Sequence, residues 1–540
     1  MDTVVTDVVV VGAGAAGLLA AVAARRLGHQ VLVVEASPFA GGATAIDEGL
    51  LWLPGNPLAG KAGASDTIED VEAYLGHVLG ATTTASTPAR REAYARTAGH
   101  LARWLISSKL PMTVVKGLPD HDPSAPGGQP QGRVLQSQPM DRRILGDWSQ
   151  RIRRRSDSSS ASGPSAMLTA GRDALGRLLR RSDHTTCGGE ALVAELLRRA
   201  TANGVDIWLE SPVVDLLLES GGAGVVVRRD GSEVTVRAGR GVVLASGGFE
   251  ANQALREEYL PLPTQAQWSA TGVDNSGDLL QLALAHGAAT AALDEAWWVP
   301  AMLAEGRAYP IDRERMLPHG LIVDQVGDRF LNEAAPSVIV GRQMYDRSRG
   351  VRAVPSYLVI DNRHRQSYDL GPWAAGSTPR RALDAHEIVR ANTLTDLAQA
   401  LGIDRAGLLG TVVRFNGFAA KGRDLDFQRG RSAWDKAGGE HGKRRNPSLG
   451  KVDKPPFWAV PVYPGDHGTK GGLLIDADSR VLRPDGSPIE GLYACGGAAA
   501  SMMKGTSPAP GASLGAALIE AFRAVLSLSG QVERIDGAHP

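Results

Sequence analysis

The chain has 540 residues, 43% of them hydrophobic and 21% charged, which suits two domains or one large composite domain. Its 58 lysines and arginines equal its 58 aspartates and glutamates, and this balance argues against nucleic acid as a partner. Only two cysteines occur, so we expect no disulfide framework and a reducing, cytoplasmic location. The sequence predicts no membrane span, signal peptide or metal site.

A glycine-rich turn follows the first predicted strand, the apolar run 8–11. Gly12 allows a sharp turn, Gly14 has no side chain to keep a pyrophosphate away, and Gly17 lets the next helix pack closely on the sheet. The helix N-terminus offers free N–H groups to phosphates, and Glu35, at the end of the next apolar run, can accept hydrogen bonds from a ribose diol. The pattern predicts dinucleotide binding, with contacts from Gly12, Gly14, Ala15, Ala16, Gly17, Glu35 and Ala36.

Later segments place small residues at further predicted turns. One directly follows Glu35 and offers a glycine pair and a threonine hydroxyl to a phosphate or ring, with a simple turn as the alternative. Others end the apolar strands near residues 244 and 494, and the last predicted helix begins at Gly511, where its N-terminus can hold negative charge on a flavin ring or a substrate oxyanion. The further cofactor contacts expected from these segments are Gly41, Gly42, Thr44, Ala245, Ser246, Gly247, Gly496, Gly511, Ala512, Ser513 and Leu514.

The remaining pattern predicts an α/β fold whose main domain is interrupted. Residues 66–106 have helical periodicity, and strands are expected over 206–209, 213–219, 224–229, 233–238 and 240–244. The composition changes between residues 290 and 460, where prolines are frequent and the predicted strands are short. We therefore expect a doubly wound, Rossmann-like dinucleotide-binding domain over 1–290 and 461–530, an inserted α+β substrate-binding cap domain over 291–460, and a flexible tail over 531–540. The Arg/Ser-rich segment 151–166 is interpreted as a solvated loop, with phosphate or partner binding as the alternative.

Motifs along nearly the whole chain resemble those of the 3-ketosteroid Δ1-dehydrogenases, within the fumarate-reductase-type flavoproteins. Besides the opening motif they are Gly41–Thr44, Ala125–Arg133, Val243–Glu250, Trp297–Trp298, Arg329–Pro336, Arg414–Gly422, Pro464–Gly472 and Gly491–Gly496. The resemblance implies that the doubly wound domain is an FAD-binding domain that holds non-covalent FAD. It also implies desaturation of a ring ketone, in which a tyrosine hydroxyl and a backbone N–H hold the ketone oxygen. A tyrosinate, assisted by a third tyrosine, removes the α proton, and a hydride passes from the β carbon to flavin N5.

The chain departs from this family at all three tyrosines. Ser337 stands where the resemblance places the base, Ser507 where it places the carbonyl-binding tyrosine, and His121 with Asp122 where it places the assisting tyrosine. Gly511, the N–H donor, is kept. A serine hydroxyl alone cannot replace a tyrosinate, because tyrosine has a pKa of about 10 and serine a far higher one. We therefore predict His121 as the base, with Asp122 orienting it or acting instead. Gly511 and Ser507 are predicted to stabilise the negative charge on the ketone oxygen. A surface loop histidine is the alternative for His121.

Three functions fit these residues. The first is an FAD-dependent oxidoreductase that acts on the CH–CH group next to a ketone of a cyclic ketone or enone, steroid-like or not, and passes electrons to an unidentified acceptor. The second is a fumarate-reductase-like enoate reductase, for which Arg342 and His121 could hold a carboxylate. The third is a non-catalytic FAD-binding scaffold, which the intact flavin motifs disfavour. The motifs favour the first.

Overall fold

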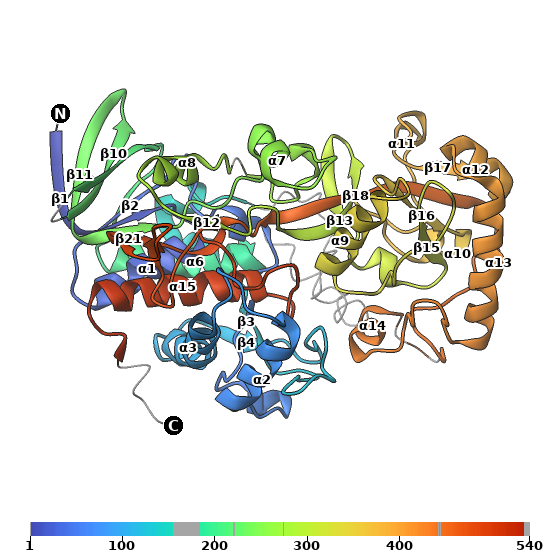
Figure 1. Cartoon of the computed structure of the whole chain (residues 1–540), viewed down its shortest axis with the longest axis horizontal. Coiled ribbons are helices and arrows are strands. Elements are labelled where there is room, and N and C mark those ends of the chain that lie inside the picture. Colours follow the sequence, from blue (N-terminus) through green and yellow to red (C-terminus); the bar gives the residue numbers. More distant parts are fainter. Residues whose placement is uncertain are drawn as a thin grey trace.

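The computed structural model describes residues 2–154, 184–219, 222–273, 275–440, 442 and 444–533. Most of the Arg/Ser-rich segment 151–166 and of the predicted tail 531–540 lies outside the described residues. The described chain folds around two large sheets. One lies at the left of Figure 1 near both termini, and the other lies at the right.

The first sheet has eight strands, in the order β20-β21-β11-β1-β2-β8, with β10 and β9 continuing from β11. β1 pairs in parallel with β11 and β2, β2 with β8, and β11 with β21. This is the doubly wound arrangement expected from the sequence. The strands are β1 (Asp2–Val11), β2 (Val31–Val34), β8 (Asp206–Trp208), β9 (Val213–Glu219), β10 (Gly222–Arg229), β11 (Ser232–Leu244), β20 (Arg480–Leu482) and β21 (Pro488–Ala494).

The central strand β1 is apolar on both faces because each face belongs to a different core. Val8 and Val10 pack with the helices α1 (Ala15–Arg26), α6 (Gly188–Ala202) and α15 (Ala512–Leu528). Val9 and Val11 face the opposite core, which includes β9, β10 and the helix α8 (Asp278–Ala285). The turn at Gly12 therefore lies at the carboxyl edge of the sheet, the edge at which doubly wound folds bind ligands.

Two expected elements differ in extent from the structure. The strands expected over 233–238 and 240–244 are one continuous strand, β11, because a register shift against β1 between Thr6 and Val8 absorbs the extra residue. The helix expected over 66–106 is two helices, α2 (Ile68–Leu79) and α3 (Pro88–Ser107). Gly80, with a φ of 61°, ends α2, and Pro88 begins α3 behind its N-cap Thr87.

The second sheet has six strands and is antiparallel, in the order β14-β13-β18-β16-β15, with β17 beside β18. Its strands are β13 (Ala296–Ala304), β14 (Arg307–Pro310), β15 (Gly320–Val323), β16 (Ser356–Ile360), β17 (Val389–Ala391) and β18 (Phe457–Thr469). The paired strands β13 and β18 extend toward the first sheet, as Figure 1 shows. β18 runs across residue 460, where the second domain boundary is predicted, and the division into domains stays a prediction.

Helix α9 (Ser337–Ser348) packs across β13, and Gly341 makes this close approach possible because a Cβ there would lie 2.5 Å from the Cβ of Trp298. None of the described helices is both long and apolar enough to cross a membrane. The other helices and strands are β3 (Leu50–Trp52), β4 (Met112–Val114), β5 (Val134–Ser137), β6 (Met140–Asp141), β7 (Thr185–Thr186), α7 (Gln253–Tyr259), β12 (Thr290–Ala291), α10 (Asn362–Ser367), α11 (Arg380–Asp384), α12 (Leu394–Leu401), α13 (Arg405–Lys421), α14 (Ala433–Gly438) and β19 (Gly472–Leu473).

Candidate active site

A cavity of about 550 Å³ lies along the carboxyl edge of the first sheet. It is bounded by the ends of β1, β2 and β11 and by the first turns of α1 and α15. Most of the predicted cofactor contacts line it: Gly12, Gly14, Ala15, Ala16, Glu35, Ala36, Gly42, Thr44, Ala245, Ser246, Gly247, Gly496, Ser513 and Leu514. Gly17 and Gly41 do not line it, and Gly511 and Ala512 line the neighbouring cavity.

The geometry of the glycine turn fits a dinucleotide pyrophosphate. Gly14 is the N-cap of α1 and provides no side-chain cap, and a Cβ added there would meet no atom within 4 Å. The first N–H groups of α1 therefore face open space, and no acidic residue lies in its first turn to repel phosphates. Gly17 acts behind this turn, because a Cβ there would lie 1.9 Å from the carbonyl oxygen of Gly12.

Glu35 shapes the same turn from the end of β2. Its Oε2 accepts a hydrogen bond from the N–H of Ala13 at 2.7 Å, and its Oε1 accepts one from the N–H of Ser37 at 2.9 Å. Burial raises the pKa of this carboxyl, and the two backbone donors oppose the rise. Glu35 thus orders the backbone that surrounds the cavity, and its contact with a ribose stays a prediction.

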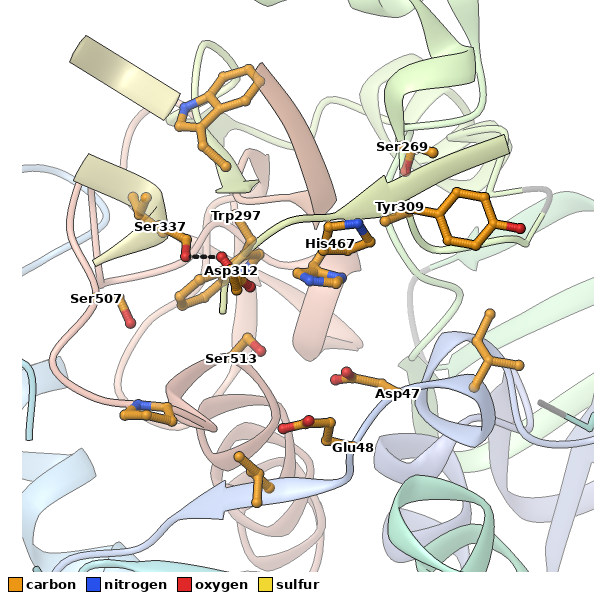
Figure 2. Close-up of a pocket in the computed structure, with 18 of the residues that line it drawn as sticks. Asp47, Glu48, Ser269, Trp297, Tyr309, Asp312, Ser337, His467, Ser507 and Ser513 are labelled. Atoms are coloured by element: carbon orange, nitrogen blue, oxygen red, sulfur yellow. Dashed lines mark hydrogen bonds between the residues drawn. The ribbon is translucent and has the colours of Figure 1, made fainter. Parts of the chain in front are cut away.

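A second cavity, of about 700 Å³, adjoins the first. Figure 2 shows its polar side chains converging from the second sheet, the loop before α15 and the segment near Asp47. Of the predicted catalytic residues, His121, Ser337, Ser507 and Gly511 line this cavity, and Asp122 does not. The residues that line both cavities are Ile46, Asp47, Arg153, Ala270, Trp297, His467 and Ser513.

Ser507 and Gly511 come together at the N-terminus of α15. Gly511 is the N-cap of this helix with a φ of 81°, and no acceptor among the described residues takes its N–H. The hydroxyl of Ser507 donates to the carbonyl of Ala509 at 3.2 Å. The positive end of the α15 dipole and an N–H without a partner can stabilise an oxyanion.

Lys470 anchors the loop that carries Ser507. Its buried ammonium donates to the backbone carbonyls of Lys504 at 2.8 Å and Thr506 at 2.6 Å, and it lies 4.2 Å from the ring centre of Trp297. Burial lowers the pKa of this amine to about 7. Since Trp297 borders both cavities, Lys470 fixes the loop to the junction between them.

His121 contacts the same loop and is held in one tautomer. Its Nδ1 lies 2.7 Å from the carbonyl oxygen of Ser507, so Nδ1 carries the proton and Nε2 keeps its lone pair. Burial lowers the pKa of the imidazole to about 4, which makes it neutral at pH 7. Asp122 does not orient this ring, because its carboxylate accepts from Ser124 at 2.7 Å and lies 3.8 Å from Nε2 of His77.

Two residues of this cavity have no sequence motif, and they surround Ser337. Asp312 lies in the turn after β14, and Arg315 follows within the next helical turn. The hydroxyl of Ser337 donates to Oδ1 of Asp312, as the dashed line in Figure 2 marks, and accepts from Nη2 of Arg315 at 2.7 Å. No spacing pattern could have found these residues, because only tertiary packing brings them to Ser337.

The doubly wound sheet with its glycine turn and the two adjoining cavities are those of a flavoprotein oxidoreductase. The FAD-binding domain family matches residues 7–514. The 3-oxosteroid 1-dehydrogenase of Mycobacterium tuberculosis is 35% identical over 97% of this chain and 98% of its own. The chain therefore belongs to the 3-oxosteroid 1-dehydrogenase family of FAD-dependent dehydrogenases, and FAD is its cofactor.

Two further relatives span almost the whole chain. The 4-oxocyclohexanecarboxylate 2-dehydrogenase of Sinomonas cyclohexanicum is 32% identical over 98% of this chain and 94% of its own. The crystal structure of 3-ketosteroid Δ1-dehydrogenase from Sterolibacterium denitrificans, in complex with 1,4-androstadiene-3,17-dione, matches with a TM-score of 0.90. That enzyme is 34% identical, and the match covers 97% of this chain and 99% of the other. The predicted fold class, the family resemblance and the FAD cofactor are confirmed.

Proposed function

We propose that this protein dehydrogenates the CH–CH group next to the ketone of a cyclic substrate. The observation that carries the proposal is the 700 Å³ cavity, which adjoins the FAD cavity at Trp297, His467 and Ser513. The printed names of the relatives support it, since they describe dehydrogenases of 3-oxosteroids and of 4-oxocyclohexanecarboxylate. When bound, FAD supplies the two-electron oxidant that accepts a hydride from the substrate.

The chain's own residues account for binding and polarising the ketone. The N–H of Gly511 and the hydroxyl of Ser507 would hold the ketone oxygen at the positive end of α15. The charge that develops on this oxygen during α-proton removal is stabilised there, so the α carbon becomes more acidic. His121 supports this site by holding the Ser507 carbonyl through Nδ1.

The enoate-reductase alternative needs cationic residues that clamp a carboxylate. Arg342 does not line the substrate cavity and pairs with Glu295 at 2.7 Å. His121 is neutral and already bonded to a backbone carbonyl. Neither of the two residues predicted from the sequence is therefore placed to clamp a carboxylate.

Anaerobic stopped-flow absorbance of the FAD-loaded protein tests the proposal. We expect the oxidised flavin to bleach on mixing with 4-androstene-3,17-dione or with 4-oxocyclohexanecarboxylate, and the ketone that bleaches it defines the substrate class. If neither ketone bleaches it, the chemically reduced protein is mixed with 1,4-androstadiene-3,17-dione and with fumarate. Oxidation by fumarate alone favours an enoate reductase, and no reaction in either direction favours a binding scaffold.

A further inference from the structure

The proposed reaction needs a base, and the three residues around Ser337 form a polar cluster at the wall of the substrate cavity. This Asp312 cluster consists of Asp312, Arg315 and Ser337, and all three line the cavity. The carboxylate of Asp312 is buried beside the guanidinium of Arg315, at 3.3 Å between Oδ1 and Nη2. Figure 2 shows Asp312 and Ser337 on the wall between Ser507 and His467.

Arg315 is fixed in the cluster by its other hydrogen bonds. Its Nη1 donates to the backbone carbonyls of Glu333 and Ala335, the latter at 2.8 Å, and its Nη2 donates to Asp312 and Ser337. Its side chain is completely buried. A buried guanidinium needs a polar or anionic partner, and its hydrogen bonds to Asp312 and Ser337 hold the Asp312 side chain in one orientation.

The two oxygens of Asp312 differ in their partners. Oδ1 accepts from Ser337 and from Arg315. Within the described part of the chain, no donor bonds to Oδ2. A carboxylate with one oxygen fixed and the other without a partner, at a cavity wall, is suited to accept a proton.

His121 is less suited to this role. Its ring is already held on two sides by other contacts. Its edge packs against Trp434 with 4.5 Å between ring centres, and its Nδ1 holds the loop of Ser507. The contacts of His121 are those of a residue that positions the oxyanion site.

We infer that Asp312 is the catalytic base of the dehydrogenation, with Ser337 and Arg315 as its positioning residues; this inference rests on the proposed function. Oδ2 of Asp312 takes the α proton of the ketone. The electrons of that C–H bond form the new double bond between the α and β carbons, while the β hydrogen leaves with its electron pair as a hydride to FAD. The product is the α,β-unsaturated ketone, and the substrate has lost one proton and one hydride.

Exchange of the α hydrogens with D₂O isolates proton removal from hydride transfer. The FAD-loaded protein is reduced anaerobically, so that no hydride can leave, and is incubated with 4-androstene-3,17-dione or 4-oxocyclohexanecarboxylate. Deuterium incorporation is followed by NMR. Asp312→Asn keeps the shape but removes the basicity, and we expect exchange to slow at least ~100-fold. The matched control is Asp346→Asn on the exposed far end of α9, which should exchange at the wild-type rate.

Further variants separate the base from its supports. Ser337→Ala should slow exchange about 10-fold, and Ser337→Thr, which keeps a hydroxyl, should restore most of it. His121→Gln should stay within about 10-fold of wild type. If Asp312→Asn fails to retain FAD, Asp312→Glu is used, whose displaced carboxylate should slow exchange about 10-fold.

The outcomes separate the inference from the proposed function. Wild-type exchange in the Asp312 variant, or a loss in His121→Gln as large as in Asp312→Asn, overturns Asp312 as the base while the dehydrogenase proposal stands. If the wild-type protein bleaches its flavin without detectable exchange, the rate of flavin bleaching replaces exchange as the readout, with the same expected ratios. If the wild-type protein neither exchanges nor bleaches with either ketone, the proposed function fails and the inference fails with it.

Discussion

The two adjoining cavities are built from different parts of the polypeptide. The cavity proposed for FAD is lined largely by small residues at turns, such as Gly12, Gly14 and Gly247. The substrate cavity takes its polar groups from side chains, among them Asp312 and Ser337, on segments distant in sequence. A cavity lined by small residues is expected to lose its ligand when a larger side chain is added. A cavity lined by polar side chains can change its reactive groups while its shape is kept.

Of the variants that distinguish the two cavities, Gly14→Val is expected to have the largest effect, which is a loss of FAD affinity. A Cβ added at Gly14 meets no protein atom within 4 Å, so we expect folding of the FAD-free chain to be unaffected, whereas the larger side chain occupies the space proposed for the pyrophosphate. We expect FAD affinity to fall at least ~100-fold, measured by fluorescence titration, with an unchanged unfolding midpoint of the FAD-free protein. Gly60→Val, at an exposed position with equal free space, is the control. Wild-type FAD affinity in the Gly14 variant would contradict the assignment of this cavity.

A smaller effect on the same cavity is expected from Glu35→Ala. The N–H groups of Ala13 and Ser37 lose their acceptors, so the glycine turn is less ordered before FAD arrives. We expect FAD to bind about 10- to 100-fold more weakly, as judged by the same titration. Glu35→Gln keeps one acceptor oxygen and should lose less. Equal affinities for the alanine variant and wild type would exclude Glu35 as a determinant of the turn.

Lys470→Met is expected to affect the substrate cavity more than the FAD cavity. Without the two bonds to the Lys504 and Thr506 carbonyls, the loop before α15 loses its anchor and Ser507 is less well placed. The ketone concentration that half-saturates flavin bleaching should rise about 5-fold, while FAD affinity changes less than about 2-fold. Lys454→Met, at an exposed site, serves as the reference. A larger change in FAD affinity than in ketone affinity would show that the lysine serves the other cavity.

The smallest effect is expected from Glu314→Gln, next to the Asp312 cluster. Burial raises the pKa of Glu314 from 4.5 to about 8. The folded chain therefore binds more protons than the unfolded chain between these values, and this contribution to stability, complete below pH 4.5, is lost as the pH rises through 8. The Tm of wild type relative to Glu314→Gln should fall by a few degrees, about 2–4 °C, between pH 5 and pH 8 in scanning calorimetry. A pH-independent difference would mean that Glu314 is charged in the folded protein.

The sequence predicts most of the residues that line the first cavity and only some of those that line the second, and the roles of these residues in binding FAD or substrate stay predictions. Glycine spacing determines the turn at Gly12 through local backbone conformation, so a linear pattern suffices there. The pairing of Asp312 with Ser337 depends on the packing of α9 across β13, the strand that pairs with β14, and no local sequence pattern predicts it. Asp122 shows that neighbours in the sequence need not share a site. His121 lines the cavity, whereas the carboxylate of Asp122 lies beside Ser124 and His77.

The paired strands β13 and β18 allow the active-site residues of this family to vary while the backbone is kept. The two strands belong to the second sheet, pair from Ala296 and Thr469 to Ala301 and Tyr463, and reach the cavity beside the first sheet. Trp297 and His467 on these strands line both cavities, so the main chain of β13 and β18 sets the distance between the two cavities. Acid–base groups can therefore be replaced over evolutionary time while that span is inherited. The TM-score of 0.90 to the Sterolibacterium enzyme measures how closely the backbone has been preserved.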